Sequence, residues 1–261
     1  MVAGAPAGGL FELRDWKLVP APDLRPLPVG DARALDRLAT ERYGIPTLLL
    51  MERAALGLEV VALEMLRSHG ASETRGGRKA GGAAPLTSEQ VSPAVVILCG
   101  PGSNGGDGFA LGRLLRHRGL AARAHIVPGA GASGDAAVNR GIFQRLGGAV
   151  VEGSASEEPA PALVVDALFG TGLSRPIEGP AAELVRWANT ARAAGARTLA
   201  VDIPSGIDAT TGEPLGPAIE ADTTVTLAGA KPGLLTPAGR DRCGRIVVAP
   251  IGVEGIIAAS G

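Results

Sequence analysis

The sequence predicts an α/β fold, a three-layer αβα sandwich with helices on both faces of a mostly parallel sheet. Short all-apolar segments recur from residue 95 onward, and segments with helical periodicity alternate with them. Gly-rich turns separate the two kinds of segment. Strands that alternate with helices form parallel sheets, and all-apolar strands are typical of sheets covered on both faces. The predicted sheet is therefore Rossmann-like.

Composition and charge are those of one large domain with a sizeable core. The chain has 261 residues, 46% of them hydrophobic, and its 25 basic and 26 acidic residues give a net charge of −1. This balance gives no electrostatic reason to expect nucleic acid or an anionic membrane as partner. Two cysteines are too few for a disulfide framework, and no apolar window is long enough to span a membrane. With no targeting pattern at the N-terminus, the expected location is the cytoplasm.

The predicted organisation is one domain over residues 31–253, flanked by two short segments. Residues 1–30 are rich in Pro, Gly and Ala and are expected to form an extended N-terminal arm. Residues 71–94 show no apolar period, which is typical of a mobile insertion. Residues 254–261 are expected to form a C-terminal tail.

The elements of the domain follow in order. Asp31 is placed to cap a first helix that ends at Gly44, and an apolar second helix is expected from Leu48 to about His69. The expected later helices cover residues 109–118, 133–146 and 181–194. The expected strands cover residues 94–98, 123–127, 149–151, 163–165, 198–201, 223–227 and 246–249.

The first loop with chemical potential is Gly100–Gly108, between a strand and a helix. It contains a G-x-G-x-x-G pattern, whose glycines allow close backbone approach and whose helix N-terminus offers free N–H groups to an anion. The next strand ends without the acid that a dinucleotide site uses to hold the ribose, and no Gly-Lys-Ser/Thr follows. A ligand-free turn is the alternative, but four glycines with Asn104 and Asp107 exceed what a tight turn needs.

Two more loops begin with an acid at a strand end. Asp166 opens the first and Asp202 the second, and Ser205 follows in the second loop. Each acid alone can be a turn carboxylate, but parallel strands bring all three loops to one edge of the sheet. There the acids, Ser205 and Asn104 would form a set of hard oxygen ligands suited to an alkali or alkaline-earth cation. Lys231 either faces the same crevice or is a solvated loop lysine.

With these loops identified, the chain resembles the NAD(P)H-hydrate epimerase family, the YjeF N-terminal domain, from about Asp31 to Val253. Ser103 departs from the family pattern, which usually has Asn there, and we expect altered contacts rather than a lost site. The segments that carry the resemblance are Leu50–Ala54, Gly100–Gly108, Asp166–Gly172, Asp202–Gly206 and Thr224–Gly233.

The resemblance implies an isomerase that interconverts the R and S forms of NADHX and NADPHX, hydrated nicotinamide cofactors. It implies one potassium ion per subunit, held by Asn104, Asp166 and Ser205. It also implies a homodimer and, as functional partner, a separate dehydratase that restores NAD(P)H from the S form. The substrate-binding residues that it implies are Ser103, Asn104, Gly105, Gly106, Asp107, Gly170, Thr171, Gly172, Leu173, Ser174, Arg175, Pro176 and Asp202.

Inverting the hydroxyl-bearing ring carbon requires loss and return of water or ring opening and closure, and both require proton transfer. Asp202 is the candidate catalytic acid–base because it ends a strand at the crevice. Two alternatives stay open: a non-catalytic ligand-binding or scaffold module of the same fold, and a nicotinamide-dependent oxidoreductase. The missing ribose acid disfavours the second.

Overall fold

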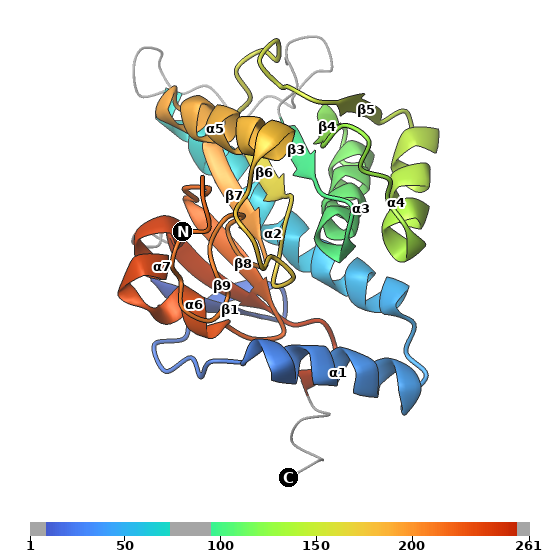
Figure 1. The fold of residues 1–261 in the computed structure, drawn as a ribbon, viewed down its shortest axis with the longest axis vertical. Coiled ribbons are helices and arrows are strands. Elements are labelled where there is room, and N and C mark those ends of the chain that lie inside the picture. The colour runs from blue at the N-terminus through green and yellow to red at the C-terminus, as the bar shows by residue number, and fades with distance from the viewer. Residues whose placement is uncertain (1–8, 74–94, 255–261) are drawn as a thin grey trace.

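The computed structural model describes residues 9–73 and 95–254 (Figure 1). Within them the chain forms a nine-stranded sheet in which every neighbouring pair is parallel except β1 and β2. The mostly parallel α/β sheet predicted from the sequence is therefore confirmed. In spatial order the strands are β2 (Lys17–Pro20), β1 (Leu10–Arg14), β9 (Arg245–Ala249), β8 (Thr223–Leu227), β7 (Arg197–Val201), β6 (Leu163–Ala167), β3 (Val95–Cys99), β4 (Ala122–Ile126) and β5 (Ala149–Glu152).

Helices lie on both faces of this sheet and at its edge. The long helix α2 (Thr47–Glu73) covers one face together with α3 (Ser103–His117) and α4 (Gly134–Arg145), and α5 (Gly179–Ala193) covers the other face (Figure 1). None of the described helices is long and apolar enough to cross a membrane. The helices are α1 (Val29–Glu41), α2 (Thr47–Glu73), α3 (Ser103–His117), α4 (Gly134–Arg145), α5 (Gly179–Ala193), α6 (Pro232–Leu235) and α7 (Pro237–Cys243).

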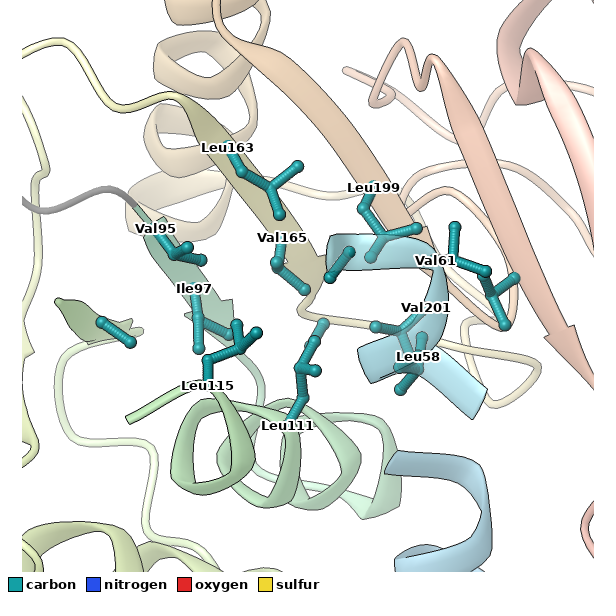
Figure 2. Packing of buried hydrophobic residues seen from close by; sticks show 14 of the residues in the cluster. Leu58, Val61, Val95, Ile97, Leu111, Leu115, Leu163, Val165, Leu199 and Val201 are labelled. Carbon is teal, nitrogen blue, oxygen red and sulfur yellow. The ribbon is translucent and has the colours of Figure 1, made fainter. Parts of the chain in front are cut away.

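The all-apolar strands divide their side chains between two cores, because successive residues of a strand point to opposite faces. In β3, Val95, Ile97 and Cys99 join the core under α2 and α3, whereas Val96 and Leu98 join the core under α5. All five are fully buried. Figure 2 shows the first core, in which the helix residues Leu58, Val61, Leu111 and Leu115 meet the strand residues Val95, Ile97, Leu163, Val165, Leu199 and Val201.

The segment expected as an extended arm belongs to the sheet. Strands β1 and β2 form an antiparallel hairpin, and β1 pairs in parallel with β9. Phe11 and Leu13 are buried in the core. The hairpin turns through Asp15 and Trp16, both with positive φ, in place of the Gly or Asn that would have marked a turn in the sequence.

Several helix boundaries differ from the prediction. The first helix begins at Val29, two residues before the expected cap Asp31, and α3 begins at Ser103, six residues before the expected start at Phe109. The second helix continues beyond His69 to Glu73. Of the expected insertion and tail, residues 74–94 and 255–261 lie outside the described residues.

Candidate functional site

The predicted loops meet where the strand order reverses. From β3 the chain continues to β4 and β5 on one side, then returns to β6 on the other side and proceeds through β7 and β8. Asp166 lies opposite Leu98 of β3 and Ala200 of β7 in the register. The loops after β3, β6 and β7 therefore leave one edge, as predicted, at the switch point where α/β sheets bind ligands.

The glycines of the first loop allow backbone to lie on backbone. Gly100 donates its N–H to the Ala167 carbonyl at 2.9 Å, and a Cβ on Gly100 would overlap the Leu168 carbonyl. A Cβ on Gly105 would overlap the Gly100 carbonyl, and one on Gly106 would lie 2.7 Å from the Met51 sulfur. These glycines therefore seat the first turn of α3 against its neighbours.

Asp166 joins the second loop to the third. The Ser205 N–H donates to Asp166 Oδ2 at 2.7 Å, and the Ser205 hydroxyl donates to Oδ1 at 2.6 Å. The Leu168 N–H also donates to Oδ1, at 3.2 Å. Burial raises the pKa of Asp166 to about 6, although the hydrogen bonds from Ser205 and Leu168 oppose the shift. The site thus holds a fully buried carboxyl that no cation neutralises within the described residues.

Asn104 extends this group from the start of α3. Its Nδ2 is buried without a hydrogen-bond partner in the described structure. A Cβ built on Gly170 would lie 3.2 Å from Asn104 Oδ1 and 3.4 Å from Asp202 Oδ2, so both side chains reach the same spot beside that glycine. The three loops therefore converge, as the sequence indicated.

The donor set suits a hard cation. Asn104, Asp166 and Ser205 offer amide, carboxylate and hydroxyl oxygens, which are ligands for alkali and alkaline-earth ions. The described residues contain no cluster of three or more His, Cys, Asp or Glu side chains that could hold a metal. A transition-metal centre built from such side chains is therefore not seen in this part of the chain.

Asp202 directly follows β7 and has a left-handed conformation with φ +65°. Its N–H donates to the Val225 carbonyl at 2.7 Å, and its Oδ1 accepts from the Leu227 N–H at 3.2 Å and from Lys231 Nζ. Only 3% of the Lys231 side chain is exposed. Lys231 therefore faces the crevice, which settles the question that its sequence position left open.

A pocket of about 920 Å³ opens over these loops, within the range typical of small-molecule sites. Five of the predicted site residues do not line it: Gly105 and Gly106 pack against neighbouring segments, Pro176 is exposed outside it, and Asp166 and Ser205 are fully buried. The predicted residues that line the pocket are Ser103, Asn104, Asp107, Gly170, Thr171, Gly172, Leu173, Ser174, Arg175 and Asp202.

Helix α1 adds residues that the sequence analysis did not assign to the site. Arg33 lines the pocket and donates to the Thr171 carbonyl at 3.0 Å, which fixes the second loop. Asp36 lines it too, and burial raises the pKa of its carboxyl. Burial also raises the pKa of Asp107 well above its usual value, and the charges of Asp202 and Asp36 add to the shift. No local pattern in the sequence marks Arg33 or Asp36.

Comparison with known proteins gives one family. Residues 47–233 match the family described as YjeF-related protein N-terminus. The chain is 33% identical to an NAD(P)H-hydrate epimerase of Levilactobacillus brevis, covering 87% of this chain and 94% of that protein. It is 36% identical to an NAD(P)H-hydrate epimerase of Limosilactobacillus fermentum, covering 85% and 95%.

The chain is also similar to a longer protein and to a solved structure. The chain is 36% identical to a bifunctional NAD(P)H-hydrate repair enzyme Nnr of Moorella thermoacetica and spans only 39% of that protein's length. The crystal structure of yeast YNL200c matches with a TM-score of 0.61 at 21% identity, covering 80% of this chain and 83% of that one. This likeness supports the three-layer α/β fold.

Proposed function

Because the chain belongs to the family of YjeF-related protein N-termini, we propose that it is an NAD(P)H-hydrate epimerase, an isomerase that interconverts R and S forms of NADHX and NADPHX. The observation that carries the proposal is the convergence of Asn104 and Asp202 beside Gly170, over the buried Asp166–Ser205 pair. The residues that the resemblance implied lie at the edge of the sheet where ligands of such folds bind, which supports the proposal.

The pocket offers complementary groups to a dinucleotide. The N-termini of α3 and α4 both line it, and no side chain caps either helix. Free N–H groups at helix N-termini bind phosphate. We therefore propose that these helix N-termini supply N–H groups to the diphosphate. Leu173, Ser174 and Arg175 also line the pocket.

Asp202 is the proposed catalytic acid–base. Lys231 and the Leu227 N–H hold its Oδ1, which leaves Oδ2 directed toward Gly170 and Asn104. A carboxylate in that position can take a proton from water or from the substrate hydroxyl and return it. The same geometry serves loss and return of water or ring opening and closure.

We also propose that Asn104, Asp166 and Ser205 hold one potassium ion. The buried Asp166 carboxyl fits such a group, since a cation would compensate the cost of burying this charge, and Asn104 would contribute its amide oxygen. When bound, potassium would neutralise Asp166 and fix the loops. The test is thermal unfolding in potassium against choline chloride. Potassium should raise the melting temperature of the wild type and have little effect on Asp166→Asn. An equal effect on both would contradict the assignment.

The reaction is tested by incubating the full chain with R-NADPHX and following the S epimer on a chiral or reversed-phase separation. Wild type should convert it, and Asp202→Asn should lower the rate by about 10²–10⁴-fold. Glu183→Gln, which removes an exposed carboxylate on α5, is the control and should match the wild type. A scaffold module would give no conversion, and an oxidoreductase would change NAD(P)H absorbance with an added substrate. Asp202→Asn with an intact fold and full activity would remove Asp202 from the mechanism.

The S epimer requires a second enzyme. Relatives named bifunctional NAD(P)H-hydrate repair enzymes are longer than this chain, which spans about two fifths of their length. We propose that an NAD(P)H-hydrate dehydratase activity consumes the product. The homodimer and the cytoplasmic location remain predictions.

A further inference from the structure

Asp107 is a buried acid of the pocket that the mechanism above does not use. On α3 its neighbours fix its direction: Gly106 packs on Met51 and Ala136, and Gly108 packs on Ala167 of β6. The helical step of 100° places Asp107 between the direction of Gly106 and that of Asn104, which reaches Gly170. Its carboxyl therefore faces the pocket beside Asn104, and the residue is only 6% exposed.

Within the described residues no cationic side chain forms an ion pair with this carboxyl. Lys231 has three N–H donors, and its Nζ bonds Asp202 Oδ1, the Leu227 carbonyl at 2.7 Å and Thr226 Oγ1 at 3.3 Å. Arg33 is engaged with the Thr171 carbonyl. In the part of the chain that the structure describes, no protein group donates a hydrogen bond to Asp107, and its small exposed fraction leaves the carboxylate little solvation, which favours the neutral form.

The surrounding charges act in the same direction. Asp36 and Asp202 face Asp107 across the pocket, so that three carboxyl groups share one ammonium group. The Asp135 carboxylate at the start of α4 accepts a hydrogen bond from Thr47 and adds no positive charge. The charged and titratable groups that line the pocket with Asp107 are Arg33, Asp36, Asp135, Arg175, Asp202 and Lys231.

We propose that Asp107 is the second acid–base residue of the epimerase and acts together with Asp202. This assignment rests on the proposed function. Asp202 is paired with Lys231 and bonded by the Leu227 N–H, whereas Asp107 has neither kind of partner. Two carboxyl groups in such different environments are suited to acid and base roles in one step.

The step balances without any further reactant. Asp107 gives its proton to the substrate hydroxyl, the carbon–oxygen bond breaks with its electron pair going to oxygen, and water leaves. The ring nitrogen stabilises the resulting cation. Water then adds to the opposite face, forming a new carbon–oxygen bond, and its proton passes to Asp202. One water leaves and one enters, and proton exchange with solvent restores both carboxyl groups.

The kinetic test is the pH dependence of R-to-S conversion at fixed potassium concentration, with Asp107→Asn compared with wild type and Glu183→Gln. Wild type and Glu183→Gln should lose activity as pH rises and Asp107 gives up its proton. Asp107→Asn should be slower by about 10²-fold or more and should lack this alkaline decline. Asp36→Asn removes a neighbouring negative charge, so its decline should begin at lower pH than in wild type.

A thermal test separates chemistry from structure. A buried acid with a raised pKa costs stability as pH rises through that pKa, and asparagine does not ionise. The melting temperature of Asp107→Asn relative to wild type should therefore increase with pH. Conversion by Asp107→Asn at the wild-type rate, or a melting temperature lowered equally at every pH, would overturn the proposal. An inactive wild type would instead refute the epimerase function itself.

Discussion

Replacing a helical glycine by alanine should have opposite effects at two positions of this chain. Gly105 lies in the first turn of α3, where a Cβ would overlap the Gly100 carbonyl oxygen and lie 2.8 Å from its carbon and 2.9 Å from the Gly100 nitrogen. Gly141 lies inside α4, where the nearest atoms are those of the Arg145 guanidinium at 3.7–3.9 Å. The first site has no room for a methyl group, and the second has.

The magnitudes follow from this difference in space. In a helix interior alanine is favoured over glycine by up to about 1 kcal/mol, so Gly141→Ala should raise the melting temperature by roughly 1–4 °C. At Gly105 the same gain is opposed by overpacking, which typically costs about 1–3 kcal/mol and more where backbone must move. Gly105→Ala should therefore be destabilised. It should also displace Asn104, and a shift of about 1 Å near a reacting group can cost roughly 10²-fold in rate.

Thermal unfolding and R-to-S conversion of both variants measure these effects. Gly141→Ala should keep the wild-type kcat/KM, since α4 presents this residue away from the pocket-lining positions. Gly105→Ala should lose stability and kcat/KM together. Were Gly105→Ala as stable and as active as Gly141→Ala, the close approach of α3 to the β3 loop would be wrong, and with it the geometry of the site.

Two further predictions concern buried ion pairs. Lys231→Met should lower kcat/KM by about 10²-fold or more, because the Asp202 carboxylate loses its charged partner; unchanged kinetics would show that Lys231 only fills space. Glu158→Gln should lower the free energy of unfolding by about 1–3 kcal/mol at pH 7. Burial opposes ionisation of Glu158, but hydrogen bonds from Arg123 and His125 prevail and hold its pKa below the usual range. The stabilisation by the ionised Glu158 is therefore fully present above pH 4.5 and is lost as pH falls through the lowered pKa. The exposed neighbour Glu157→Gln should leave the unfolding curve unchanged, and an equal effect of both would refute the reasoning.

The sheet and the meeting of the loops could be predicted because both follow from local pattern. An all-apolar strand that ends in Asp166 or Asp202 can be recognised from its own residues, and parallel connectivity then places both acids at one edge. The start of α3 could not be predicted. Glycine disfavours helix, so the Gly-rich segment Gly100–Gly108 indicates a loop. Its contacts with Gly100, Met51 and Ala167 decide the conformation, and they are tertiary.

The sequence gives no local signal that Asp36 and Lys231 belong to the pocket. Asp36 is one of several charged residues on a helix, and Lys231 lies 195 positions further along the chain. In Figure 1, α1 crosses the end of the molecule toward which the parallel strands point. That packing brings Asp36 into the pocket with Asp202 and Lys231, and only three-dimensional contacts reveal it.

Asp202 has a strained backbone conformation, and the contacts around this residue also orient its carboxylate. A left-handed residue other than glycine costs about 1–3 kcal/mol unless its surroundings enforce it. Here the Val225 carbonyl binds its N–H, while the Leu227 N–H and Lys231 bind one carboxylate oxygen, so the other oxygen is directed at Gly170. Glycine at this position would relieve the strain but would remove the carboxylate as well. Asparagine adopts the left-handed region readily and keeps the shape of the side chain, so Asp202→Asn changes the proton chemistry while preserving the turn.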